Sequence, residues 1–239
     1  MSAAWADTVE WVRTAPLVWL LLTLLVYRFS LWVRTRSGGH PLAQPVLICL
    51  VVIGAILLVA DVPYPDYRAG TELIAFLLGP ATVAFAVPLH RSVEELRGLV
   101  APILIALTLG VFVAVLSGYG LVALLGGEDD LAASMAAKTA TTPVAIAVAE
   151  VIGGIGPLSA VFAVVAGVLG AVAGPAVLDL LRIRDPRARG VAMGTVSHGI
   201  GTSRSLADGE VQGAVAGLST GLAALAVSLI APLVVGWFG

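Results

Sequence analysis

Apolar residues in this chain form long runs that short polar islands separate. Each run is about as long as the roughly 17–25 residues that an α-helix needs to cross a bilayer. Four runs are uninterrupted: Leu17–Val33, Pro45–Ala60, Leu158–Leu181 and Val211–Val235. Charged residues gather between the runs, above all at Asp61–Arg68 and Arg182–Arg189. The pattern predicts an all-α, polytopic integral membrane protein.

The composition supports this class and excludes others. Hydrophobic residues make up 59% and charged residues 12% of the chain, and its mean hydropathy is +1.03, whereas a soluble domain carries roughly 25% charged residues. The lone Cys49 offers neither a disulfide nor a metal cluster, and no basic region suits nucleic acid. We expect no cofactor and no removable signal peptide. We expect a single domain over residues 1–239 with about seven or eight transmembrane or re-entrant segments.

Two further apolar runs, Glu72–Leu89 and Leu131–Val151, carry helix-breaking residues in the middle. The breaks fall at Gly79 and Pro80 in the first run and at Thr141, Thr142 and Pro143 in the second. A proline inside a helix removes a backbone hydrogen bond and clashes with the preceding turn. We expect Thr142 to cap a new half-helix and Pro143 to begin it. Each half of the second run is too short to span alone.

The segments around these breaks carry weaker signals. Ser92–Glu95 has the spacing of a capping box and predicts a helix from there to about Leu125, with a kink at Pro102. The loop Asp61–Gly70 is typical of an interfacial turn. Thr82–Val87 is similar to Pro143–Val148, which indicates either an internal repeat or a chance match between common residues.

Arginines set the expected orientation, because short cytoplasmic loops are enriched in Lys and Arg. With Arg34 and the loop Arg182–Arg189 inside, the acidic turns at Asp61 and Glu128 fall outside. This arrangement requires one of the two broken segments, most simply Leu131–Val151, to be a re-entrant hairpin that returns to its own side; if Leu131–Val151 spans instead, the loop Arg182–Arg189 falls outside.

Backbone groups freed by a helix break in a membrane must be shielded by protein or by a water-filled cavity, because each freed group that faces lipid costs several kcal/mol. Paired interrupted helices point to substrate sites, where the N-termini of half-helices direct positive dipole ends at anions. A kink that serves only packing is the alternative for any single break. Two breaks and a polar stretch in one small chain favour a function.

Lys138 is the only lysine in the chain and lies in an apolar run, about one turn before Pro143. An ionisable residue at membrane depth indicates a functional site. The alternative is a side chain that reaches to the membrane surface. Glu150, at the end of its half-helix, suits an interfacial or capping role as well as proton coupling.

The most polar stretch inside an apolar region is Ser197–Arg204, within the small-residue segment Gly190–Leu206. Its side chains supply donors and a titratable ring: Ser197, His198, Thr202 and Arg204. Adjacent helical residues do not face each other, and no nucleophile elbow is present, so a hydrolase built on Ser197 and His198 is disfavoured. We expect His198 either to respond to protons and contact a substrate or to be a packing histidine.

These stretches resemble the LrgB/CidB family over essentially the whole chain. The matching segments are residues 78–84, Lys138–Pro143, Glu150–Gly154 and Gly194–Arg204 with Glu210. The resemblance implies a permease for small monocarboxylates such as pyruvate, glycolate or glycerate in the bacterial cytoplasmic (inner) membrane, not an enzyme. It also implies an LrgA/CidA-like membrane partner and a homo-oligomer. The alternative is an antiholin-like regulator of murein hydrolase export and autolysis that acts through a holin-like partner.

Ala147 departs from the family pattern, which has an acidic residue at that place. On the permease reading, a small carboxylate binds between the break at Thr141–Pro143 and the polar stretch Ser197–Arg204. Lys138 or Arg204 supplies the charge, and the helix start supplies backbone N–H groups. His198 can carry a proton.

Overall fold

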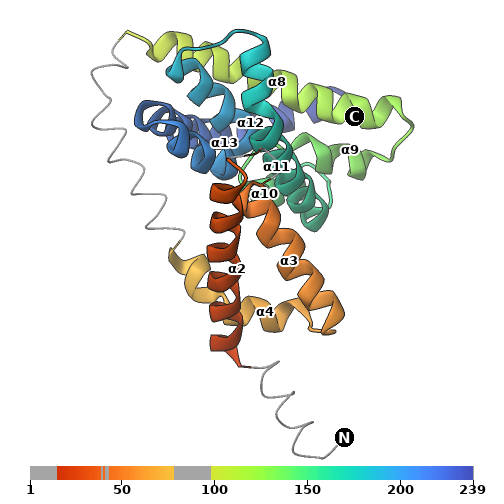
Figure 1. Cartoon of the computed structure of the whole chain (residues 1–239). Helices are drawn as coiled ribbons and strands as arrows, with labels where there is room; N and C mark the ends of the chain where they lie inside the picture. The colour runs from red at the N-terminus through yellow and green to blue at the C-terminus, as the bar shows by residue number, and fades with distance from the viewer. Residues whose placement is uncertain (1–14, 39, 41–42, 78–97, 239) are drawn as a thin grey trace, which may run out of the picture. The chain divides into compact units, whose positions relative to one another are not determined.

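The computed structural model describes residues 15–38, 40, 43–77 and 98–238, and all of the regular elements in these ranges are helices. Four helices are long and apolar enough to cross a membrane: α2 (Pro16–Arg36), α8 (Val100–Leu124), α11 (Gly156–Leu180) and α13 (Glu210–Phe238) (Figure 1). The chain is an all-helical membrane protein, as predicted. The predicted break at Gly79 and Pro80, the capping box at 92–95 and the repeat element at 82–87 lie outside the described residues.

The chain divides into two compact units, Met1–Ala84 and Phe85–Gly239. In the first unit, α2 packs against α3 (Pro45–Val59) and α4 (Tyr64–Gly70). The interfacial turn predicted over Asp61–Gly70 is thus partly helical. The α4 helix forms because it docks on α2: the Tyr67 and Thr23 hydroxyls lie 3.1 Å apart in a hydrogen bond.

The second unit begins its described part with α8, which starts at Val100 rather than near Ser92. Gly98 has a φ of +83°, a left-handed conformation that interrupts a helix at this place. Pro102 is the third residue of α8 and produces no kink, because the first N–H groups of a helix have no partner within the helix.

After α8 the chain forms a helical hairpin from α9 (Asp129–Ala136) and α10 (Thr142–Val151). The backbone N–H of Ile155, just past α10, donates to the Ser134 hydroxyl at 2.7 Å. Gly154 lies so close to α9 that a Cβ there would be 2.7 Å from the Ser134 nitrogen. The chain that follows α10 therefore contacts the second half of α9, and the re-entrant segment stays a prediction.

The cap of α10 differs by one residue from the prediction. Thr141 is the N-cap, with extended backbone angles and no side-chain capping hydrogen bond, and Thr142 and Pro143 are the first two helical residues. The proline fits because neither of the first two positions needs its N–H inside the helix.

Beyond α11 the basic loop is shorter than predicted, because α12 (Pro186–Asp208) already begins inside it. Asp185 caps α12: its carboxylate accepts the backbone N–H of Arg187 at 2.8 Å and pairs with the Arg187 guanidinium at 2.8 Å. The side-chain hydrogen bond from Arg187, followed by that from its backbone, lowers the pKa of Asp185 to about 2.

Helix α12 folds back on itself at His198, whose φ of 40° and ψ of −130° are not helical. Gly201 lies against the carbonyl of Met193, although residues eight apart in a straight helix are separated by about 12 Å. The first half of α12 then packs on the start of α13, where a Cβ on Gly190 would lie 2.6 Å from the Gln212 carbonyl. The α12 segment is thus a second hairpin that returns to the side where it began.

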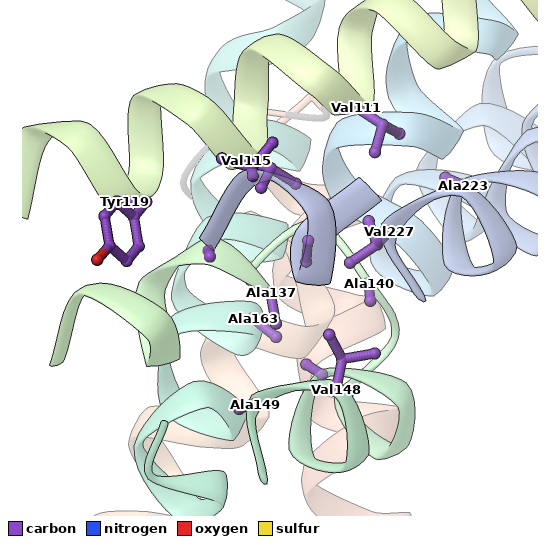
Figure 2. Packing of buried hydrophobic residues seen from close by; sticks show 14 of the residues in the cluster. Val111, Val115, Tyr119, Ala137, Ala140, Val148, Ala149, Ala163, Ala223 and Val227 are labelled. Atoms are coloured by element: carbon purple, nitrogen blue, oxygen red, sulfur yellow. The ribbon is translucent and has the colours of Figure 1, made fainter. Parts of the chain in front are cut away.

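The two hairpins enter from opposite ends of α11. The α9–α10 hairpin ends just before α11 begins, and the α12 hairpin begins just after α11 ends. Between them lies a core of small and β-branched residues, shown in Figure 2, in which α8, α10, α11 and α13 all take part: Val111, Val115, Val148, Ala149, Ala163, Ala223 and Val227.

Candidate functional site

The two hairpin tips contact the same face of α11. The Ser159 hydroxyl donates to the carbonyl of Ala145 in α10 at 3.1 Å. One turn later, the carbonyl of Ala163 accepts a hydrogen bond from Nε2 of His198 at 2.9 Å. Residues four apart lie on one face of a helix, so α11 holds both breaks within one turn of each other.

Alanines let the tips approach this closely. Ala137 and Ala140, in the segment that joins α9 to α10, belong to the same buried cluster as Ala163 (Figure 2). A methyl group is the smallest side chain beyond hydrogen, so backbone groups at a break can come near one another without exposing a void. The site is therefore built largely from backbone and small side chains.

His198 is buried, with 5% of its surface exposed. Its ring lies on Gly167 of α11, where a Cβ would be only 2.6 Å from Cε1. The Ala163 carbonyl can only accept a hydrogen bond, so Nε2 carries the proton and Nδ1 of the neutral ring keeps a lone pair. Nδ1 is thus the atom that can take up a further proton or accept a hydrogen bond.

Hydroxyl groups satisfy the backbone that the α12 break frees. Thr202 donates to the His198 carbonyl at 3.0 Å and lies 2.9 Å from the Thr220 hydroxyl of α13. Thr220 donates to the Gly194 carbonyl at 3.2 Å. Thr202 was predicted as a site residue, whereas Thr220 was missed because it lies in an apolar run with no local signal.

Several buried hydroxyls near the tips have no hydrogen-bond partner among the described residues. They come from the first tip (Thr139), the second tip (Ser197) and α13 (Ser219). A buried, unsatisfied polar group costs about 1–3 kcal/mol. These groups are donors that a bound polar ligand could use, and only Ser197 among them was predicted.

Lys138 lies at the first tip and reaches toward α8. Its Nζ donates to the carbonyl of Ala114 at 3.0 Å, across Gly118, where a Cβ would lie 2.5 Å from that nitrogen. Ala114 is ten residues before Leu124, or about 15 Å from the end of α8. That distance is about half of a hydrocarbon core roughly 30 Å thick, so the ammonium is bonded well inside a helix that is long enough to span a membrane. No carboxylate among the described residues forms an ion pair with it.

Three predicted site residues begin α10 at the first tip and are at least partly exposed: Thr141, Thr142 and Pro143.

Two other predicted site residues lie away from the tips. Arg204 forms an ion pair with Asp208 at 3.3 Å near the end of α12. Glu150 lies over the start of α11, where a Cβ on Gly156 would be 2.7 Å from its carboxyl oxygen, and a carboxylate at a helix N-terminus is favourable. These contacts give Arg204 and Glu150 local partners away from the tips.

In a comparison with protein families, the model of the LrgB-like family matches residues 23–237. The chain belongs to the LrgB-like family. It is 35% identical over 221 residues to the uncharacterized protein YwbG of Bacillus subtilis strain 168, covering 92% of this chain and 98% of that protein. It is 28% identical over 224 residues to the antiholin-like protein LrgB of Bacillus mycoides strain KBAB4, covering 94% and 97%. No solved structure matches it.

Proposed function

We propose that this LrgB-like chain is a permease, and not an enzyme, for small monocarboxylates of the pyruvate, glycolate and glycerate class in the bacterial cytoplasmic membrane. The observation that carries the proposal is the position of Lys138. In this proposal its ammonium lies near mid-membrane at a hairpin tip, bonded to a backbone carbonyl and to no described carboxylate. A charge at that depth is costly and calls for a counter-ion.

The surroundings of Lys138 suit a small anion. The first N–H groups of α10 are unsatisfied by the helix itself and lie at the positive end of its dipole. The partnerless hydroxyls of Thr139 and Ser197 can donate to a second oxygen or to an α-substituent.

Two hairpins that enter from opposite ends of α11 also suit alternating access. Transporter sites lie near the bilayer midplane where interrupted helices meet, and one bundle moves against another around the site. In this proposal the α9–α10 hairpin opens the site to one face of the membrane, and the α12 hairpin opens it to the other. Nδ1 of His198 then faces the site as a proton acceptor.

A second candidate is a regulator that acts through a holin-like membrane partner. The name of the Bacillus mycoides relative, antiholin-like protein LrgB, favours it. A regulator of this kind needs packing faces for its partner and no translocation of solute. The two candidates therefore differ in whether the purified chain moves a carboxylate by itself.

Uptake into proteoliposomes decides between them. Purified chain is reconstituted with and without an LrgA-like partner, and uptake of labelled pyruvate, glycolate and glycerate is measured against protein-free liposomes. We expect saturable uptake of at least one of the three by the chain. Uptake that never exceeds that of protein-free liposomes, with the partner present or absent, would exclude the permease and leave the regulator.

A further inference from the structure

An apolar groove of about 470 Å³ runs between α8 and the first half of α12, and its inner end lies at Thr195 and Val196, just before the break at His198. One wall is formed by Pro102, Ala106 and Gly110 of α8, and the other by Val191, Ala192 and Val196 of α12. Its volume falls within the roughly 300–1,000 Å³ that small-molecule sites occupy. Nothing in the proposed transport path uses it.

The groove has the depth of one membrane leaflet. It extends along α8 from Leu99 to Gly110, eleven residues, or about 16 Å of helix. A hydrocarbon core roughly 30 Å thick has leaflets of about half that depth. The occupant that fits is therefore an extended chain that enters from one membrane surface and ends near the middle.

The lining is suited to hydrocarbon and not to a polar solute. At the inner end, Thr195 turns its methyl group toward Gly110, where a Cβ would lie 3.8 Å from Thr195 Cγ2. The Thr195 hydroxyl is buried away from the groove surface. A small carboxylate would find no polar partner along these walls, whereas an acyl chain would contact apolar atoms throughout.

Arginines precede the mouth of the groove in the chain, and an ion pair lines the mouth itself. Asp185 and Arg187 line it and are paired with each other, and Arg189 of the same loop pairs with Asp179 at 2.6 Å. Arg182 and Arg184, just before the mouth, are exposed and form no ion pair with any acid that the structure describes. Two arginines thus remain to bind an anion at the level of lipid headgroups.

We propose that this groove binds an anionic phospholipid, with one acyl chain between α8 and α12 and the phosphate held by Arg182 and Arg184. Basic loops of this kind are expected on the cytoplasmic side, so the lipid comes from the inner leaflet. Basic pockets between transmembrane helices at that surface are suited to anionic headgroups. A bound chain packs against the first half of the α12 hairpin and supports its position on α8.

The test is native mass spectrometry of delipidated, full-length chain incubated with phosphatidylglycerol or phosphatidylcholine of the same acyl composition. We expect stronger binding of phosphatidylglycerol. Replacing Arg182 and Arg184 by Gln should reduce that preference by roughly fivefold for each arginine, the effect expected of one basic residue near an anionic lipid surface. Inorganic phosphate should not compete, because it has no chain to fill the groove.

Gly110→Leu fills the groove with a side chain and should remove most bound phosphatidylglycerol. Gly120→Leu is the matched control on the same helix, because a Cβ at Gly120 would meet no atom within 4 Å and Gly120 does not line the groove. Equal binding of the two lipids by the unaltered chain would overturn the proposal, as would equal lipid retention in the two glycine variants. A changed oligomeric state in Gly110→Leu without loss of lipid would instead assign the groove to a second copy of the chain.

Discussion

Lys138 and His198 share a feature at the scale of single residues, since each polar side chain bonds to a backbone carbonyl of a neighbouring helix. Lys138 bonds to Ala114 in α8, and His198 bonds to Ala163 in α11. A glycine makes room for each: Gly118 beneath the ammonium and Gly167 beneath the imidazole. Side chains held in this way keep a defined position at membrane depth before any substrate arrives.

Lys138→Met should abolish carboxylate uptake while the protein still folds, because methionine keeps an unbranched apolar stem and removes the charge. Lys138→Arg should be tolerated only in part, because guanidinium is larger and its donors lie in a fixed plane. Uptake kinetics of reconstituted variants measure both. Arg204→Gln is the control, since Arg204 pairs with Asp208 near the end of α12, and it should retain uptake. Uptake by Lys138→Met with unaltered affinity and rate would remove this lysine from the site.

His198→Gln should flatten the pH dependence of uptake. A histidine with an unperturbed pKa of about 6.5 changes charge near neutral pH, and glutamine can still donate to the Ala163 carbonyl but cannot titrate. Initial uptake rates at a series of pH values, with the pH equal on both sides of the liposome membrane, make the comparison. If the profile of the variant matches that of the unaltered chain, His198 is a packing histidine.

At the scale of elements, the backbones of α12 and α13 lie in close contact. Gly190 and Gly194, four residues apart on α12, lie against the carbonyls of Gln212 and Ala216, also four apart on α13. Small residues at such spacing let membrane helices approach closely, and packing then stabilises the pair where the hydrophobic effect cannot. The hairpin of α12 is therefore anchored along its first half and bends only beyond it.

Gly194→Ala should destabilise this pair, because the added Cβ would overlap the Ala216 carbonyl. Inserting atoms into a packed interface typically costs about 1–3 kcal/mol. Gly199→Ala is the matched control in the same helix, since its Cβ would meet no atom within 4 Å. Thermal unfolding in detergent should show a lower Tm for Gly194→Ala only. An equal Tm for the two variants would show that the helices separate easily here.

At the scale of the whole molecule, the second unit has three helices long and apolar enough to span a membrane, α8, α11 and α13, and the α12 hairpin returns to the side where it began. Val215 near the start of α13 packs with Ile103 near the start of α8, and Phe238 at its end stacks on Tyr119 near the end of α8. The two helices therefore run parallel, which requires α12 to return to the side where it began. The loop Arg182–Arg189 and the turn Glu128–Asp130 then face opposite sides.

Cysteine labelling tests that arrangement in a Cys49→Ala background. Glu128→Cys should react with a membrane-impermeant maleimide added to intact cells, and Arg184→Cys should react only after the cells are permeabilised, because basic loops stay inside. Both positions are exposed. Strong labelling of Arg184→Cys in intact cells would reverse the orientation.

The sequence by itself determined the membrane class, the four helices of spanning length, the Thr-Thr-Pro break and the family, because each depends on a local signal; of the expected seven or eight segments, Pro45–Ala60 forms a helix of only 15 residues. An apolar run of sufficient length must leave water, and a threonine followed by proline favours the start of a helix, whereas Pro175 and Pro232 lie inside α11 and α13 without ending them. Lys138 was found in the same way, as a charge in an apolar run. Its contact with Ala114 could not be foreseen, because no local rule pairs a lysine with a carbonyl 24 residues earlier.

Only the tertiary structure decided the second hairpin and which of the predicted residues lie beside it. No proline marks the break at His198, and a non-glycine residue with positive φ is unfavourable by itself. The break persists because Gly167, the Ala163 carbonyl and Thr202 hold His198 in that conformation from other parts of the fold. Arg204 was assigned to the site from its place in a polar stretch, but the end of α12 places Asp208 beside it. A helix that folds back on itself brings together residues that a straight helix would keep apart. Long-range packing alone decides whether such a segment is folded back or straight.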